Sequence, residues 1–296
     1  SACNFYMPIF EEALDAYGLP LELRYLPIIE SALNPSAVSR AGASGLWQFM
    51  IGTGKIYGLE SNSLVDERRD PIKATWAAAR YLKEMYDIYG DWNLVIAAYN
   101  CGPGTINKAI RRANGETDYW KIYNYLPKET RGYVPAFIAA NYVMTYYCDH
   151  NICPMETNIP ASTDTVQVNK NLHFEQIADL CNVPLDQIKS LNPQYKKQMI
   201  PGDSKPYTLR LPIDAISTFI DKQDTIYAHR ADELFRNRKT VAVKEITPST
   251  RKTTTAVAGK GKLTYYTIKS GDTLSTIAGK YSVTIKDIQR WNGMSN

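Results

Sequence analysis

A single glutamate behind an apolar run constrains this chain more than any other feature. Glu30 follows Leu26-Pro-Ile-Ile, and the segment after it is rich in small, turn-forming and hydroxyl residues. Pro20 suits the first position of a helix, where its missing N–H would have no partner. Asn34-Pro35 must end that helix, because a residue that precedes proline avoids the helical region. The sequence therefore predicts a helix with Glu30 in its last turn.

Two effects are expected to raise the pKa of the Glu30 carboxyl. The negative end of the helix dipole disfavours a carboxylate by about 0.3–1 kcal/mol, and apolar neighbours add a desolvation cost that favours the protonated acid. An acid that stays protonated near neutral pH can donate a proton to a leaving group, as cleavage of a glycosidic bond requires. The competing interpretation is a solvated glutamate at a helix end, and position alone favours that one.

Three separated motifs reverse that preference. The first runs from Glu30 to Met50, the second is Ala97-Ala-Tyr-Asn-Cys-Gly-Pro-Gly104, and the third is Glu129-Thr-Arg-Gly-Tyr-Val134. With these motifs in this order, about residues 5–155 resemble the catalytic domain of the lytic transglycosylases of glycoside hydrolase family 23. The resemblance implies a mainly α, lysozyme-like (goose-type/soluble lytic transglycosylase) helical domain that acts on peptidoglycan.

The resemblance also implies a reaction for Glu30, with the Tyr133 hydroxyl held close to its carboxylate. Glu30 would protonate the leaving oxygen of the β-1,4 bond between N-acetylmuramic acid and N-acetylglucosamine. It would then remove the proton from the muramoyl 6-hydroxyl, which attacks C1 and leaves a 1,6-anhydro end. A conventional glycosidase uses two carboxylates; one carboxylate fits a mechanism in which the substrate's acetamido group replaces the nucleophile. A goose-type lysozyme that uses water, and an inactive wall-binding protein, stay open as alternatives.

Five further residues are assigned to the substrate groove by the same resemblance. Ser39 and Gln48 would be polar wall residues that bond acetamido and hydroxyl groups, and Met50 would be an apolar floor. Tyr99 would line the cleft beside Asn100. The alternative for both tyrosines, at positions 99 and 133, is an ordinary core residue.

The first 155 residues are predicted to be mostly helical. Residues 44–57 are expected to form a second helix. Asp70 should cap a third helix, with Pro71 as its first residue and an end near Tyr89; a second catalytic carboxylate is the alternative for Asp70. Further helices are expected at residues 92–99, 106–113 and 128–147.

A strand, two short helices and a strand are predicted from Thr163. The same order begins again one hundred positions later, where Leu274 matches Phe174, and this indicates an internal repeat. The second copy, with Ser270-Gly-Asp-Thr-Leu274, resembles a LysM module, a small α+β unit that binds chains containing N-acetylglucosamine. This implies a glycan-binding role for Gly271, Asp272, Thr273 and Asn292. The first copy lacks that turn, so its sugar binding is in doubt and a structural spacer is the alternative.

Four parts are therefore expected along the chain. They are a catalytic domain at 1–155, a degenerate LysM-like module at 163–213, a helical segment and linker at 214–263, and a LysM module at 264–296 that is incomplete at its C-terminal end. The last module would have a sheet edge without its partner strand.

Composition limits the partners. The chain has 296 residues and 21 tyrosines, whose flat apolar faces and hydroxyls suit sugar rings. Its net charge of +4 is weak evidence for an acidic polymer as partner. Lysines and arginines form no block with interleaved aromatics, so nucleic acid is not expected. The three histidines show no metal spacing, so neither a metal nor another cofactor is expected.

The five cysteines bear on compartment and chemistry. Cys148 and Cys153 could close a small loop in an oxidising compartment, with two buried free thiols as the alternative. Cys101 would suit a cysteine peptidase, but a thiolate needs a base and no histidine precedes His150. We expect a monomer in the bacterial periplasm or cell envelope, with a lipid anchor to the outer membrane at Cys3 as an open possibility.

Overall fold

The computed structural model describes residues 2–153, 157, 159–235, 278 and 288. The chain divides into two compact units, Ser1–Ile246 and Thr247–Asn296, and the account below concerns the first. The module predicted at 264–296, with Gly271, Asp272, Thr273 and Asn292, lies outside the described residues apart from positions 278 and 288.

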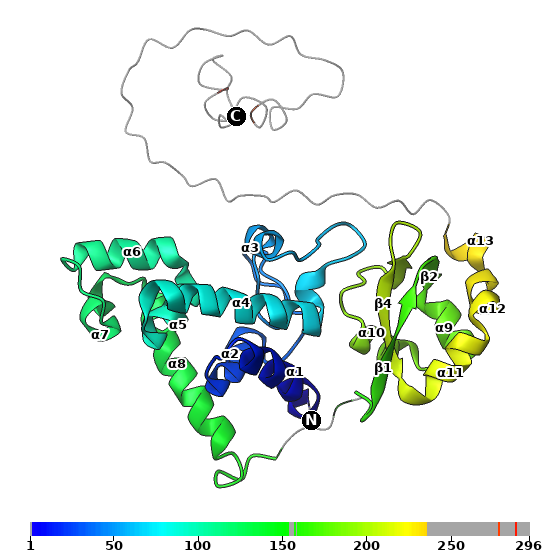
Figure 1. The fold of residues 1–296 in the computed structure, drawn as a ribbon, viewed down its shortest axis with the longest axis horizontal. Helices are drawn as coiled ribbons and strands as arrows, with labels where there is room; N and C mark the ends of the chain where they lie inside the picture. The colour runs from blue at the N-terminus through cyan, green and yellow to red at the C-terminus, as the bar shows by residue number, and fades with distance from the viewer. Residues whose placement is uncertain (1, 154–156, 158, 236–277, 279–287, 289–296) are drawn as a thin grey trace. The chain divides into compact units, whose positions relative to one another are not determined.

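Helices build the N-terminal part of the chain, as the sequence predicts (Figure 1). Helix α1 packs on α4, α4 on α5, and α5 on α8, while α2 also packs on α8. The largest fully buried side chains of this part include Trp47, Tyr6, Phe10 and Leu82, each worth roughly 1.5–3 kcal/mol of burial. The elements are α1 (Ala2–Ala16), η1 (Leu21–Tyr25), α2 (Leu26–Ser31), α3 (Ile51–Ile56), η2 (Glu67–Arg69), α4 (Pro71–Tyr89), α5 (Trp92–Cys101), α6 (Pro103–Arg112), α7 (Tyr119–Ile122), η3 (Tyr123–Tyr125) and α8 (Lys128–Thr145).

The predicted start and end of α4 are confirmed. The Asp70 carboxylate accepts hydrogen bonds from the backbone N–H groups of Ile72 and Lys73, both at 3.0 Å, and Pro71 follows as the first helical residue. The helix ends where Gly90 adopts φ 64°. Asp70 is therefore the N-cap, and its buried carboxylate is engaged by the helix it begins.

The single helix predicted for residues 44–57 is wrong, because only Ile51–Ile56 is helical. Ser44 instead forms isolated antiparallel bridges to Val38 and Phe49. Gly45 has φ +89° and a Cβ there would lie 1.8 Å from the carbonyl oxygen of Arg68, so a close backbone approach dictates this turn. Leu46, Trp47 and Phe49, apolar residues that suggested a helix, are buried in this turn, and Trp47 donates from Nε1 to Thr75 Oγ1 at 2.9 Å.

Several helix boundaries also differ from the predictions. The helix expected from Pro20 begins as the 3₁₀ segment η1 and continues as α2. It ends before Asn34-Pro35, since Ala32 (φ 51°) and Leu33 (φ 59°) are left-handed. Helix α6 begins at Pro103 rather than at residue 106, and α8 ends at Thr145. Helices α1 and α7 were not predicted.

The strand, helix, helix, strand order predicted from Thr163 is confirmed. Strand β1 (Thr163–Val168) pairs antiparallel with β4 (Tyr207–Pro212), and α9 (Phe174–Cys181) and α10 (Leu185–Leu191) lie between them in sequence. A second pair, β2 (Asn171–His173) with β3 (Met199–Pro201), was not predicted. We call residues 163–213 the first module.

The segment after the first module is more ordered than its polar sequence suggests. It forms α11 (Ile213–Asp221), α12 (Gln223–Ala228) and α13 (Ala231–Leu234). Ala215, Phe219 and Ile226 are buried in the same apolar cluster as the module's own core. The expected weakly helical segment is therefore packed against the module as far as residue 235.

Cys148 and Cys153 are free and exposed. Neither the predicted bridge between them nor the alternative of two buried thiols is correct for this structure. The described residues contain no helix with the length and apolar character needed to cross a bilayer.

We predict that Gly45→Ala destabilises the protein more than Gly42→Ala. Both glycines have positive φ, +89° and +87°, but an added Cβ meets backbone only at Gly45 and open space at Gly42. Gly42→Ala should lower the free energy of unfolding by the ~1–3 kcal/mol of backbone strain, and Gly45→Ala by more. Urea denaturation measures both, and equal losses would contradict this account of the turn.

Candidate active site

Glu30 and Tyr133 meet where α2 packs on α8. Glu30 is the penultimate residue of α2, Tyr133 lies in the second turn of α8, and both side chains are half-buried. The Tyr133 hydroxyl donates a hydrogen bond to Glu30 Oε1. Helix packing thus brings together two motifs that lie far apart in the chain (Figure 1).

The environment of Glu30 favours its protonated form. The pKa of Glu30 is raised from 4.5 to about 7, mainly because burial disfavours the carboxylate; the hydrogen bond from Tyr133 opposes this rise and the negative charge of Glu129 adds to it. Burial and the neighbouring Glu30 raise the pKa of the Tyr133 hydroxyl well above its ordinary value, so this group is a neutral donor. A carboxyl with a pKa near neutrality can act first as an acid and then as a base.

Tyr99 and Asn100 connect the end of α5 to its neighbours. Tyr99 donates from its hydroxyl to the Trp47 carbonyl oxygen at 2.7 Å. Burial and the negative charge of Glu30 raise the pKa of Tyr99 well above its ordinary value. Asn100 Oδ1 accepts from Thr130 Oγ1 at 2.8 Å, so the Asn100 side chain ties α5 to the start of α8.

Ser39, Gln48 and Met50 lie on one loop, residues 37–50, which we call the groove loop. The exposed Ser39 accepts from the Ala43 N–H at 3.0 Å through its hydroxyl. Gln48, with φ 48°, donates from Nε2 to the carbonyl oxygens of Ala37 (3.2 Å) and Gly45 (2.8 Å). The half-buried Met50 is the N-cap of α3.

Ser31, next to Glu30, joins the groove loop to α2, since its hydroxyl donates to the Leu46 carbonyl oxygen at 3.0 Å. The structure thus couples Glu30 directly to Tyr133 and electrostatically to Tyr99, and it connects the groove loop to them through Ser31 and Trp47. Glu129, Ser31 and Thr130 were not predicted as parts of this site. Glu129 and Thr130 stand in the third motif, but only the packing of α8 shows what they contact.

Cys101 does not have the surroundings of a nucleophile. It is half-buried, and burial raises the pKa of its thiol, which disfavours the reactive thiolate. Among the described residues, no group of three or more histidine, cysteine, aspartate or glutamate side chains is placed to hold a metal ion.

Comparison with known proteins identifies the domains. Residues 7–122 match the transglycosylase SLT domain, 162–228 the LysM-like domain of lytic transglycosylase MltD, and 266–296 the LysM domain. The chain carries a transglycosylase SLT domain followed by two LysM-type domains. The predicted fold class, a mainly α lysozyme-like domain followed by small α+β modules, is confirmed. The SLT match includes Glu30, the groove loop and Tyr99, whereas Glu129 and Tyr133 lie beyond it.

Individual relatives agree with the domain matches. The chain is 33% identical over 281 residues to membrane-bound lytic murein transglycosylase D of Escherichia coli K12, an alignment that covers 93% of this chain and 57% of that protein. The soluble lytic murein transglycosylase of the same strain is 33% identical over 124 residues, or 40% of this chain and 19% of the relative. The crystal structure of the 70 kDa soluble lytic transglycosylase from Escherichia coli is similar with 29% identity and a TM-score of 0.42, covering 48% of this chain and 24% of that one.

We predict opposite pKa changes at Glu30 when its two neighbours on α8, Tyr133 and Glu129, are altered. Tyr133→Phe removes the hydrogen bond that lowers the pKa, so the pKa should rise above about 7, whereas Glu129→Gln removes a negative charge and should lower it. Titration of the Glu30 carboxyl carbon by NMR measures both. A Glu30 pKa near 4.5 in the parent protein would contradict the burial argument.

Glu30 should also make stability depend on pH. Its pKa rises from 4.5 to about 7 on folding, so the stability contributed by the neutral acid is complete below about pH 4.5 and is lost as pH rises through 7. Glu30→Gln, always neutral, should match the parent protein at pH 4 and exceed it at pH 8 by about 2–3 kcal/mol. Urea denaturation of both proteins at several pH values tests this. If the free energies of unfolding of Glu30→Gln and the parent differed by the same amount at every pH, titration of Glu30 would not be the cause of the difference.

Proposed function

We propose that this chain is a peptidoglycan lytic transglycosylase that cleaves the β-1,4 bond between N-acetylmuramic acid and N-acetylglucosamine and leaves 1,6-anhydro-muramoyl ends. One observation carries the proposal: Glu30, with a pKa of about 7, accepts a hydrogen bond from a neutral Tyr133. The SLT match and the names of the relatives support the same reaction. The chain spans 57% of the length of the first of those relatives.

The mechanism uses Glu30 twice. Protonated Glu30 donates its proton to the glycosidic oxygen as the bond from C1 to that oxygen breaks, and the substrate's acetamido oxygen stabilises C1. The resulting Glu30 carboxylate, held by the Tyr133 hydroxyl, accepts the proton of the muramoyl 6-hydroxyl as its oxygen bonds to C1. Glu30 is then protonated again, so no second carboxylate and no cofactor is needed.

Substrate binding is proposed for the groove residues. Ser39 and Gln48 would contact acetamido and hydroxyl groups, Met50 would contact an apolar sugar face, and Tyr99 with Asn100 would complete the wall. We further propose the division into 1–155, 163–213, 214–263 and 264–296, with the last part binding glycan through Gly271, Asp272, Thr273 and Asn292.

A cell-envelope location follows from a peptidoglycan substrate and agrees with the membrane-bound relative. We propose that the protein acts there as a monomer on glycan strands. Attachment through a lipid on Cys3 was left open by the sequence. In the structure Cys3 lies in α1 and its half-buried side chain packs against the core, so a lipid at that sulfur would require this end of α1 to open.

Mass spectrometry of digested sacculi tests the proposed reaction. Anhydro ends would support a transglycosylase, hydrated reducing ends would indicate a goose-type lysozyme, and intact glycan would indicate a wall-binding protein without activity. The products therefore decide among all three functions.

We predict that Glu30→Gln lowers turnover of peptidoglycan by at least the ~10²–10⁴ that general acid–base catalysis supplies. Glutamine keeps the shape and accepts the Tyr133 hydrogen bond, but it cannot transfer the proton, so glycan binding should survive. Asp70→Asn is the matched control, because asparagine also caps helices and Asp70 caps α4. If Glu30→Gln released anhydro-muropeptides at the parent rate while Asp70→Asn did not, the assignment of catalysis to Glu30 would be wrong.

A further inference from the structure

Residues 60–69 of the SLT domain, which we call the docking loop, insert into the first module. Leu64 and Val65 are buried, at 2% and 0% exposure, within the apolar cluster that contains the module's core. Val65 forms an antiparallel bridge with Tyr195. On either side, Asp66 N–H donates to the Gln194 carbonyl oxygen and Lys196 N–H donates to that of Leu64, both at 2.8 Å. The module thus supplies backbone partners for the docking loop.

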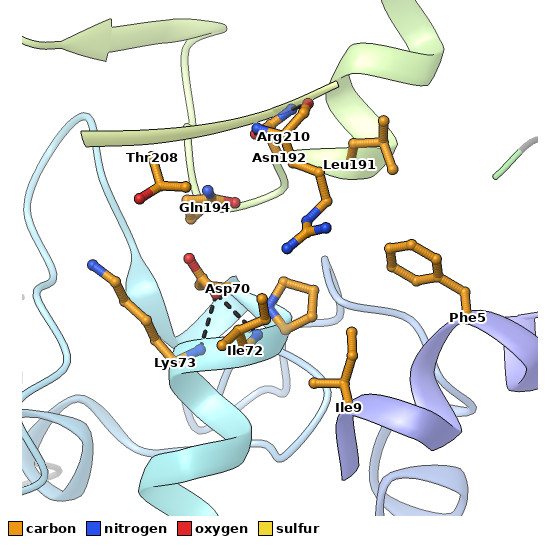
Figure 2. A pocket seen from close by; sticks show the side chains of 11 residues that line it. Phe5, Ile9, Asp70, Ile72, Lys73, Leu191, Asn192, Gln194, Thr208 and Arg210 are labelled. Carbon is orange, nitrogen blue, oxygen red and sulfur yellow. Dashed lines mark hydrogen bonds between the residues drawn. The ribbon is translucent and has the colours of Figure 1, made fainter. Parts of the chain in front are cut away.

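Polar side chains surround this apolar contact. Glu60 accepts from the Tyr207 hydroxyl at 3.0 Å to each carboxylate oxygen and pairs with Lys205 Nζ at 2.7 Å. Figure 2 shows a pocket in which Asp70 and Lys73 of the SLT domain face Gln194 and other residues of the module. The module is therefore joined to the SLT domain by an apolar insertion with a polar rim.

The docking loop also contacts the groove loop, through the side chain of Arg68. Arg68, 5% exposed, donates through Nε and Nη2 to Asp66 at 2.9 and 2.8 Å. Its Nη1 donates to the carbonyl oxygens of Gly42 at 2.8 Å and Phe49 at 2.9 Å. These carbonyls stand on the two sides of the groove-loop turn. Gln48 and Met50 flank Phe49 in sequence, and Ser39 precedes Gly42 on the other side. One guanidinium therefore fixes the separation of both sides of this loop.

We propose that Arg68 is a positioning residue for the substrate groove, and that the first LysM-like module acts as a structural part of the SLT domain by holding Arg68 in place through Val65 and Asp66. The order of contacts is continuous: Gln194 holds the Asp66 backbone, the Asp66 carboxylate holds Arg68, and Arg68 holds Gly42 and Phe49. The proposal rests on the proposed function, because it concerns glycan binding in that groove.

The chemistry of Arg68 requires a guanidinium at this position. Its Nε and Nη2 donate to the two oxygens of Asp66 while its third nitrogen, Nη1, donates to two carbonyls, and an ammonium cannot reproduce that geometry. Buried hydrogen bonds to a charged group are individually strong, and their loss leaves the carbonyls without a donor. Arg68→Lys should therefore let the groove loop change shape while the charge is kept.

The first experiment compares Arg68→Lys with Arg24→Lys in the full chain, on soluble glycan strands freed of peptide. Arg24 is a matched control because it also bonds a carboxylate, Glu11, and a neighbouring group, Tyr25, but away from the groove loop. Arg68→Lys should raise KM roughly 10-fold, the effect of losing one well-placed polar contact, with a smaller change in kcat and an unchanged pH profile. Arg24→Lys should leave both constants unchanged.

These readouts separate a positioning role from simple stabilisation. If Arg68 only stabilised the fold, Arg68→Lys would lower the unfolding midpoint but leave KM unaltered at a temperature well below unfolding. That result would overturn the proposal. Binding of the same glycan to Glu30→Gln and to Glu30→Gln/Arg68→Lys gives an independent measure, with roughly 10-fold weaker binding expected in the double variant. A parent chain that does not cleave glycan would instead reject the proposed function.

A second experiment tests the module's part. Val65→Asp places a charge in the apolar contact and should reproduce the KM increase of Arg68→Lys, while Ile88→Asp, at a site 67% exposed on α4, should not. The double variant Val65→Asp/Arg68→Lys should be no worse than either single variant, because both break one series of contacts. If Val65→Asp does not fold, Val65→Ala replaces it in the same measurement, and a smaller increase in KM is expected. Independent, additive effects would show that the module does not act through Arg68.

Discussion

The hydrogen bond between Tyr133 and Glu30 is the interaction on which the chemistry proposed for the helical domain depends. A carboxyl group that is partly removed from water resists ionisation, and burial raises the pKa of Glu30 to about 7 although Tyr133 acts against that rise. In the proposed mechanism Glu30 acts first as an acid and then as a base, and the Tyr133 hydroxyl would hold its carboxylate once the proton has left. Packing of α2 on α8 is what keeps both groups in place.

The backbone around Glu30 is shaped for the same purpose. Left-handed Ala32 and Leu33 end α2 directly after Ser31, and the Ser31 hydroxyl then reaches the groove loop at the Leu46 carbonyl. Such backbone conformations cost free energy in residues other than glycine. The surrounding core offsets that cost, since Leu26, Leu46 and Trp47 are fully buried beside the turn.

The buried pair of Asp66 and Arg68 has a different physical role. A buried ion pair adds little net stability because desolvation offsets its attraction, but removing one partner leaves a costly uncompensated charge. Such a pair therefore favours one arrangement of its surroundings over others. Here the arrangement includes two carbonyls of the groove loop and the contact of the docking loop with the first module. This module, whose sequence lacks the Ser-Gly-Asp-Thr-Leu turn, shares its apolar core with Leu64 and Val65 of the SLT domain.

Local sequence determined those features that depend on neighbouring residues. Asp70-Pro71 sets the start of α4 because a capping carboxylate and a proline act within one turn, and alternating residues around Thr165 and Leu209 set strands β1 and β4. The motif around Glu30 likewise indicated a protonated acid. Only the tertiary structure decided that residues 44–50 form a turn, because the Arg68 carbonyl that requires Gly45 comes from a distant segment. It alone also decided that Glu129 adds its charge to the Glu30 site and that Val65 lies in the core of the first module, since these contacts join residues whose spacing in sequence carries no signal of their proximity.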